Sequence, residues 1–213
     1  MDKITVAHIA VNEGDLNYFT LENLMRGLPW QEIATVNWPD EYPEKPNVRF
    51  QIAHCNNALL LHYHVQENFV KAQYIRPNEP VYEDSCVEFF ISFDNKQQYY
   101  NLEFNALGTG LIGYGPQTKA LRNRLPAEAI EKVLTTSMVQ NSQGKKTWDM
   151  ILVIPVDLFT AHPITDLAGL SAHANFYKCG DGLPTPHFVS WAPIDAEKPN
   201  FHLPEFFGEL YFE

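Results

Sequence analysis

The chain has 213 residues, of which 45% are hydrophobic and 19% are charged. These values are typical of a folded globular protein and exclude a disordered chain, and the length suits one domain, residues 1–213, with a sizeable core. The 26 acidic residues outnumber the 15 basic ones, which gives a net charge of −11. Such a surface repels phosphate backbones and anionic lipids, so nucleic acids and charged membranes are excluded as partners.

No apolar run approaches the roughly 18 residues that a membrane-spanning helix needs. The apolar stretch near the N-terminus is short, is interrupted by His8 and lacks a small-residue cleavage site, so we do not expect a signal peptide. The protein is expected in the cytoplasm, or in a secreted or periplasmic location if the sequence is that of a mature form. Cys55, Cys86 and Cys179 are widely spaced, which predicts neither a zinc knuckle nor a disulfide framework.

Taken in chain order, the predicted elements are mostly short strands. Apolar residues recur with a period of two, or strand-forming residues cluster between turns, in the segments 48–54, 59–65, 86–93, 98–105, 147–154, 172–179, 187–192 and 207–212. One short helix is predicted at 125–134, with Pro126 near its first position. Many short strands and one small helix predict an all-β fold, an antiparallel β-sandwich of the jelly-roll or immunoglobulin-like kind.

The segments 86–93 and 98–105 are separated by a loop of hairpin length. Their apolar residues meet one another in a single register, because a slip by one residue would move them all to the wrong face. This register places Glu88 directly opposite Glu103. Like charges facing each other destabilise a strand pair, so we expect a cation, a shared proton or a hydrogen-bonding ligand between them.

The same pairing argument places a set of polar side chains on the non-core face of one sheet: Arg49, Gln51, His62, His64, Glu88, Asn101, Glu103 and Asn105. Solvated faces favour Lys and Thr, whereas Arg, His, Glu and Asn are suited to hydrogen-bonding the hydroxyl groups of a ligand. Aromatic residues flank the set and could stack on a flat apolar surface. The face is therefore a candidate binding site for a polar ligand, with an ordinary solvated face as the alternative.

An ordered series of motifs resembles family 9 carbohydrate-binding modules over about residues 30–212. The first two motifs are VYEDSCVEFFI at 81–91 and YYNLEFNALG at 99–108. Trp148-Asp149 and Asn175-Phe176-Tyr177 follow in the family's order. The C-terminal motifs are SWAP at 190–193 and FHLPEFFGEL at 201–210. The order of the series is more specific than any single motif.

The resemblance implies a β-sandwich that holds the end of a sugar chain, typically the reducing end of a β-glucan or xylan, between two aromatic side chains. Tyr82 stands where the family has a stacking Trp, and Glu88 where it has an acid that binds hydroxyls. Asn175 matches a polar ligand, and Tyr177 and Trp191 are candidates for the second platform, with core packing as the alternative for Trp191. The expected carbohydrate-binding residues are Tyr82, Glu88, Glu103, Asn105, Asn175, Tyr177 and Trp191.

A module of this family is not an enzyme. The resemblance implies that the chain binds a mono- or oligosaccharide in polysaccharide catabolism, beside a separate glycoside hydrolase. Calcium is structural in such modules, so a calcium ion is a candidate cofactor, with Asp40, Glu41, Glu83 and Asp84 as the available carboxylates.

Two other functions stay open. Directly opposed strand residues have Cβ atoms about 4.5–5.5 Å apart, which is compatible with the carboxyl spacing of about 5–5.5 Å in retaining glycosidases, so Glu88 and Glu103 could serve a glycoside-processing enzyme. A haem-binding sandwich would need an axial Met/His pair, for which the sequence offers Met25, Met138 and Met150.

Overall fold

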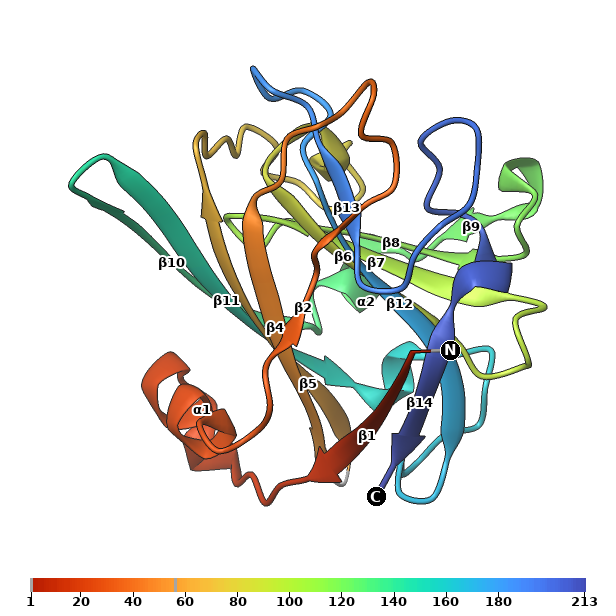
Figure 1. The fold of residues 1–213 in the computed structure, drawn as a ribbon. Coiled ribbons are helices and arrows are strands. Elements are labelled where there is room, and N and C mark those ends of the chain that lie inside the picture. The colour runs from red at the N-terminus through yellow and green to blue at the C-terminus, as the bar shows by residue number, and fades with distance from the viewer. Residues whose placement is uncertain (1, 56) are drawn as a thin grey trace.

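Two β-sheets, A and B, pack face to face and bury the apolar side chains of their strands between them (Figure 1). The computed structural model describes residues 2–55 and 57–213. The β-sandwich expected from the period-two pattern is confirmed. Within these described ranges, no helix has the length and hydropathy that are required to span a bilayer.

Sheet A carries the candidate site. Its strands run in the order β14, β12, β6, β7, β8 and β9, each antiparallel to the next, and β13 and β3 extend it beside β12. The strands of sheet A are β3 (Thr35–Val36), β6 (Cys86–Ser92), β7 (Tyr99–Asn105), β8 (Gly110–Gly115), β9 (Asn123–Arg124), β12 (Ser171–Cys179), β13 (Phe188–Ser190) and β14 (Gly208–Phe212).

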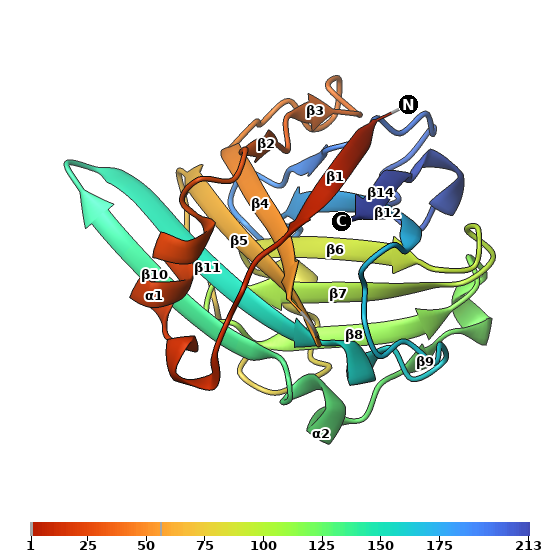
Figure 2. The ribbon, with the colours of Figure 1, turned by 90° about the horizontal axis from the view of Figure 1, so that it is seen from below.

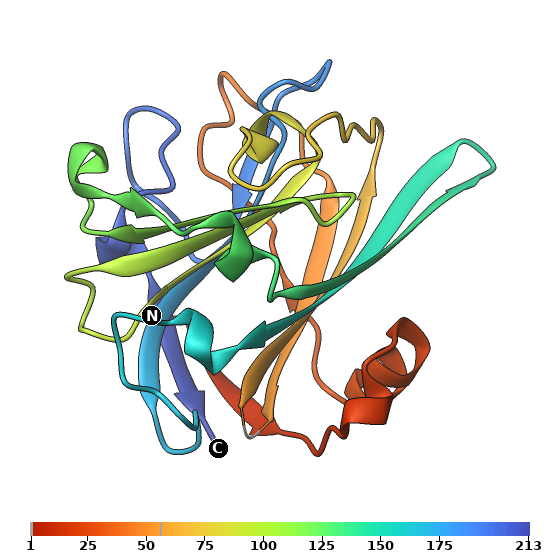
Figure 3. The same cartoon turned by 180° about the vertical axis from the view of Figure 1, so that it is seen from behind.

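Sheet B runs in the order β10, β11, β5 and β4, again antiparallel, and β2 pairs with β4. Its strands are β2 (Gln31–Glu32), β4 (Asn47–Cys55), β5 (Ala58–Glu67), β10 (Leu134–Ser142) and β11 (Lys145–Pro155). The β10–β11 hairpin extends well beyond the rest of the sandwich (Figure 3). The strand β10 was not among the predicted segments, since its Thr, Ser and Gln residues give no apolar alternation.

Strand β1 (Lys3–His8) joins the two sheets. Its first four residues pair with β14, and Ala7 and His8 pair with Ala53 and His54 of β4. Both pairings are parallel, which makes β1 the exception in a sandwich that is otherwise antiparallel. One continuous path of paired strands therefore runs from β10 through β1 to β9 (Figure 2).

The helices are short. Helix α2 (Ala127–Ile130) lies inside the predicted segment 125–134, but the chain becomes extended at Leu134, where β10 begins. Helix α1 (Tyr18–Met25) was not predicted; Asn17 caps its N-terminus, and it buries Leu21 and Met25 against sheet B. The described residues thus hold two α-helices where one was expected. The 3-10 segments are η1 (Glu13–Asp15), η2 (Val81–Glu83), η3 (Lys119–Leu121), η4 (Val156–Leu158) and η5 (Pro204–Phe206).

The predicted register of the segments 86–93 and 98–105 is confirmed, because Glu88 pairs with Glu103. The expectation that all the polar residues share one face is wrong. Strands β4 and β5 belong to sheet B, whereas β6 and β7 belong to sheet A, so the polar residues form two separate groups. The alternating pattern identifies the face of a strand but not the sheet to which a hairpin belongs.

The polar group on sheet B is held by neighbouring protein atoms. The amide of Gln51 donates to the carbonyl oxygens of Met25 and Leu28 at 3.0 and 2.7 Å. The guanidinium carbon of Arg49 lies 4.4 Å from the centre of the Trp30 ring. These contacts fix the segment after α1 on the outer face of sheet B.

A charged network crosses the sandwich interior. Lys178 on β12 is fully buried, and its Nζ lies 2.9 Å from Glu67 Oε2 on β5. Burial lowers the pKa of His187 to about 3, so this neutral ring accepts a hydrogen bond from Lys178 Nζ at 2.7 Å. Trp148 Nε1 donates to Glu67 Oε1 at 2.7 Å. Because Glu67 and Trp148 lie on sheet B, the network ties the two sheets together.

Candidate functional site

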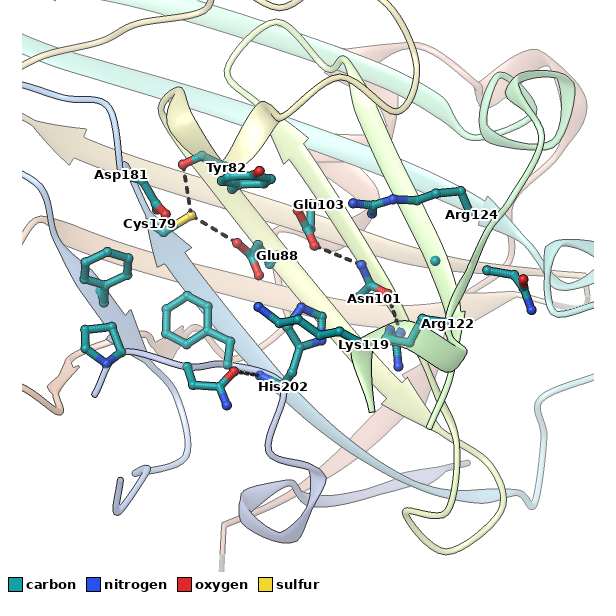
Figure 4. Close-up of a pocket in the computed structure, with 16 residues that line it drawn as sticks. Tyr82, Glu88, Asn101, Glu103, Lys119, Arg122, Arg124, Cys179, Asp181 and His202 are labelled. Carbon is teal, nitrogen blue, oxygen red and sulfur yellow. Dashed lines mark hydrogen bonds between the residues drawn. The ribbon is translucent and has the colours of Figure 1, made fainter. Parts of the chain in front are cut away.

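A cavity of about 450 Å³ opens on the outer face of sheet A, away from the sandwich core. Its floor is formed by β6, β7 and β8, and its walls come from η2, η3, β9 and the loops that follow β12 and precede η5. We call it the sheet A cavity. Figure 4 shows Tyr82 on one side of it and His202 on the other, with the carboxyl groups of Glu88 and Glu103 between them.

The two opposed carboxyl groups of the floor are both buried. Burial and the charge of Glu103 together raise the pKa of Glu88 well above its usual value, which favours the protonated form of this carboxyl group. Burial also raises the pKa of Glu103 to about 7, against the lowering effects of the Asn101 amide and Arg124. A proton held by one of the two acids lowers the repulsion between them.

The floor holds one polar atom without a partner. Asn101 Nδ2 donates to Glu103 Oε1 at 2.9 Å, but Glu103 Oε2 has no hydrogen bond although only 4% of the residue is exposed. A buried carboxylate oxygen that lacks a donor carries a free-energy cost of about 1–3 kcal/mol. A hydroxyl group of a ligand in the cavity would supply the missing donor.

Arg122 holds the floor in place. Its guanidinium donates to the carbonyl oxygens of Gly115, Pro116 and Tyr99 and to the side-chain oxygen of Asn101. Gly113 leaves the space that this arrangement needs, because a Cβ there would lie 2.7 Å from Asn101 Oδ1. The orientation of Asn101, and through it that of Glu103, is therefore fixed before any ligand arrives.

Two cations on the wall are free to contact a ligand. Lys119 and Arg124 line the cavity, their residues are exposed, and no hydrogen bond or ion pair joins either side chain to the described part of the chain. Arg124 also lowers the pKa of Glu103 through its charge. Both side chains can donate to the oxygen atoms of a polar ligand above the floor.

The two aromatic walls differ in how tightly their side chains are packed. Tyr82 in η2 is 36% exposed, so its ring is available for stacking. Opposite it, Phe201 stacks on Tyr177 with ring centroids 4.2 Å apart and an interplanar angle of 9°. Burial lowers the pKa of His202 to about 3, and the neutral ring hydrogen-bonds through Nδ1 to the Tyr99 hydroxyl at 2.8 Å. This second wall is packed against buried residues and is uncharged.

The structure brings three of the seven expected binding residues together. Tyr82, Glu88 and Glu103 all line the sheet A cavity. The other four do not line it. Asn105, fully buried at the end of β7, donates to the Tyr74 carbonyl and to Asp84 Oδ2, and so fixes the chain that leads into η2.

Asn175 and Tyr177 support the cavity from outside, whereas Trp191 belongs to the sandwich core. The Asn175 side chain accepts from the backbone N–H of Ala192 and donates to its carbonyl oxygen, which holds the chain after β13. Tyr177 is fully buried beneath Phe201. Trp191 packs at the edge of the core, with its ring centroid 5.6 Å from that of Phe176. This position agrees with core packing, which was the alternative to a stacking platform.

Sequence reasoning missed the cationic and imidazole parts of the cavity. Arg122 and Arg124 are two residues apart, a spacing that places both on one face only if the segment is a strand. Strand β9 has two residues, too few to give a periodic pattern. His202 fixes the loop before η5 through its hydrogen bond with the Tyr99 hydroxyl, and it also lines the cavity.

Two of the four carboxylates expected to bind calcium, Glu83 and Asp84, have other partners. Asp84 Oδ2 accepts from the backbone N–H groups of Gln73 and Tyr74, and Lys71 Nζ lies 3.6 Å from Asp84 Oδ1. Glu83 Oε2 accepts from the Tyr74 hydroxyl at 2.6 Å. A lysine and N–H donors occupy the positions that a hard cation would need, so these residues do not fit a calcium site.

The haem alternative gains no support from the described residues. Met25 is the last residue of α1 and is buried against sheet B, Met150 lies in the core, and Met138 lies in the β10–β11 hairpin. None of the three lines the sheet A cavity.

Comparisons with known proteins agree with this geometry. Residues 20–212 match carbohydrate-binding family 9. A solved structure from Bacteroides uniformis, provisionally described as a carbohydrate-binding protein, is 38% identical with a TM-score of 0.91, and the match covers 99% of each chain. No curated protein matches the sequence.

Two more distant structures share the fold. Both are a family 9 carbohydrate-binding module from Caldicellulosiruptor kristjanssonii, at 12% identity and a TM-score of 0.60. The matches cover 100% of the present chain and 96% or 94% of the other. One is a complex with glucose and the other a complex with cellotriose.

Proposed function

The chain belongs to carbohydrate-binding family 9, and from this we propose that its sheet A cavity holds the terminal, reducing-end sugar of a plant-type β-glycan or oligosaccharide. The protein is a non-catalytic binding module. It would serve polysaccharide catabolism beside a separate glycoside hydrolase. The observation that carries the proposal is the unpartnered Glu103 Oε2, buried in a cavity that has an exposed aromatic ring at its mouth.

The cavity's chemistry suits a pyranose. Such a ring has an apolar face of C–H groups and an edge of hydroxyl groups, each of which both donates and accepts. Tyr82 can cover the apolar face, while Glu103 Oε2 accepts from one hydroxyl and Arg124 or Lys119 donates to another. The other wall, Phe201 and His202, is uncharged and leaves the polar contacts to the floor.

A glycosidase that uses Glu88 and Glu103 is the weaker alternative. A retaining enzyme needs one ionised carboxylate at the anomeric carbon and one acid that exchanges its proton. Here Glu88 receives a hydrogen bond from the Cys179 thiol at 3.0 Å, and the environment of Glu88 opposes its ionisation. The opposed pair therefore serves better as an acceptor and donor for hydroxyl groups.

Calorimetry tests the reducing-end proposal directly. Glucose, xylose, cellobiose and xylobiose are titrated into the protein, each beside its methyl glycoside. We expect the free sugars to bind and the methyl glycosides to bind at least about tenfold more weakly, since a methyl group on the anomeric oxygen removes the donor of its hydroxyl. Equal binding of both series would refute recognition of the reducing end. If none of the sugars binds, the proposal that the ligand is a β-glycan or its oligosaccharide is refuted.

The Tyr82→Ala variant is expected to lose at least about tenfold in sugar affinity, because the stacking surface is gone. Its melting temperature should stay within about 3 °C of the wild type, since the side chain is partly exposed and outside the core. Tyr211→Ala is the matched control, because Tyr211 is 42% exposed on β14 and does not line the cavity. A large loss of stability in Tyr82→Ala alone would assign Tyr82 to packing.

Affinity should rise with pH. A carboxylate accepts a sugar hydroxyl more strongly than a carboxylic acid, and the pKa of Glu103 is about 7, so affinity should increase about tenfold from pH 6 to pH 8. Burial also raises the pKa of Asp181, another lining residue, to about 6. Calorimetry should show the same rise in Asp181→Asn; its loss there would assign the pH dependence to Asp181.

A further inference from the structure

Below the sheet A cavity, three buried ligand atoms converge: Cys86 Sγ, Cys179 Sγ and a carboxylate oxygen of Glu88, all within 4.8 Å of one another. Cys86 and Glu88 are two residues apart on β6 and so point to the same face. Cys179 lies directly opposite Cys86 on β12. In residues 2–55 and 57–213, no other three His, Cys, Asp or Glu side chains bring their ligand atoms this close together.

The spacing is close to what a metal ion requires. Zinc binds sulfur at about 2.3 Å and carboxylate oxygen at about 2.0–2.2 Å, so the ligands of a tetrahedral site lie about 3.5–3.8 Å apart. The Cys179 sulfur is 3.0 Å from Glu88 Oε1, and no separation in the group exceeds the ideal by more than about 1 Å. Rotation about the side-chain bonds of the two cysteines can close such a gap without moving either strand.

We propose that Cys86, Glu88 and Cys179 form a binding site for a thiophilic divalent cation, Zn²⁺ by its ligand chemistry. Two thiolates select a borderline-soft metal over calcium or magnesium, which prefer oxygen donors alone. Both cysteines are free, so their sulfur atoms are available as ligands. The site goes beyond the proposed sugar binding, for which neither sulfur atom is needed.

An ion can reach Cys86, Glu88 and Cys179 from solvent, and a fourth ligand lies nearby. Glu88 and Cys179 line the cavity, so the site opens to solvent through it. Asp181 also lines the cavity and interacts with the Cys179 side chain, beside which Figure 4 shows it. The Asp181 carboxylate, a water molecule or a ligand hydroxyl can complete four-coordination.

Metal binding here must displace protons. Burial raises the pKa of the Cys86 thiol to about 12 and that of Cys179 well above its usual value, so both groups are protonated when no metal is bound. The ion would bind as two thiols and the Glu88 carboxyl release their protons to solvent. Affinity for the ion should therefore increase with pH.

Cobalt titration tests the site through a signal that depends on the sulfur ligands. The metal-free protein, kept reduced with a phosphine, is titrated with Co²⁺ and then with Zn²⁺. We expect a thiolate-to-cobalt charge-transfer band in the near ultraviolet that saturates at one equivalent and is abolished by Zn²⁺. A wild-type protein that shows no such band, and whose melting temperature Zn²⁺ does not raise, would overturn the proposal.

Variants locate the ion. Cys86→Ser and Cys179→Ser should each weaken Co²⁺ binding at least about tenfold, a loss of the size seen when a metal site is perturbed. Glu88→Gln keeps both sulfurs and should weaken it as well, which covers the case of a cysteine variant that fails to fold. Cys55→Ser is the matched control, because Cys55 is also a buried free cysteine but lies at the end of β4 in sheet B. Loss of the band in Cys55→Ser alone would place the ion elsewhere.

The proposals of sugar binding and of metal binding can be refuted independently of each other. Sugar binding is measured by calorimetry on the metal-free protein, and metal binding is measured by absorbance without sugar. Cys86→Ser should bind sugar as the wild type does, because Cys86 does not line the cavity.

Discussion

Lys178→Met will unfold at a temperature about 10 °C or more below that of the wild type. The substitution removes the ammonium group that lies 2.9 Å from Glu67 Oε2 and leaves the Glu67 carboxylate buried between the sheets without a cation. Breaking a buried ion pair from one side costs about 3–5 kcal/mol, and about 1 kcal/mol shifts the melting temperature of a chain this long by about 2–4 °C. Differential scanning calorimetry at pH 7 measures the difference.

Lys132→Met is the control, since Lys132 Nζ lies 2.8 Å from Asp157 Oδ2 with both side chains more than half exposed. Loss of such a solvated pair should change stability by less than about 1 kcal/mol. The double variant Lys178→Met/Glu67→Gln should recover part of the loss, because the uncompensated charge is gone. If both single Lys variants melt alike, burial does not set the strength of the Lys178 pair.

Glu103→Gln will lose sugar affinity and gain stability. An amide cannot provide the carboxylate oxygen that accepts the sugar hydroxyl, so affinity should fall at least about tenfold and no longer vary with pH around 7. Without ligand, the variant should melt a few degrees higher than the wild type at pH 8, since it buries no charge.

The sign of the stability effect follows from the pKa. Folding raises the pKa of Glu103 from its usual value near 4.5 to about 7, so the folded state loses stability as pH rises through that interval. The advantage of Glu103→Gln should be absent at pH 4, grow between about pH 4.5 and 7, and stay constant above. Glu197→Gln makes the same charge change at an exposed loop position and should show no such pH dependence. A variant less stable than the wild type at pH 8 would mean that the carboxylate is well solvated by its neighbours.

The floor of the cavity and one residue of its walls, Tyr82, could be predicted from the sequence, whereas the rest of the walls could not. Alternation along two strands fixes which residues face each other, and it gave the Glu88–Glu103 pair in the correct register. Whether an outward-facing residue meets solvent, ligand or a covering loop depends on contacts made far along the chain. Asn175 and Tyr177 face outward as Glu88 does, but the chain from 192 to 207 covers them.

Some elements were missed because their stability is not local. Helix α1 spans eight residues, too few for a periodic signal, and it depends on packing Leu21 and Met25 against sheet B. Strand β1 is defined by partners distant in sequence on both sides. Four of the expected binding residues do not line the cavity. Asn105, Asn175 and Tyr177 lie beside or beneath it, and Trp191 packs at the edge of the core. A sequence motif therefore locates a region of the fold better than it identifies the residues that contact a ligand.

The position of β1 between the two sheets has a consequence for folding. Lys3 pairs with Glu209, about 200 residues later in the chain, so closing this contact costs much chain entropy and should come late. While the chain is being synthesised, β1 is made long before β14 exists, so until then residues Lys3 to Val6 of β1 lack their partner strand. The nascent protein thus passes through a period with an unprotected sheet edge, when pairing with another chain competes with folding.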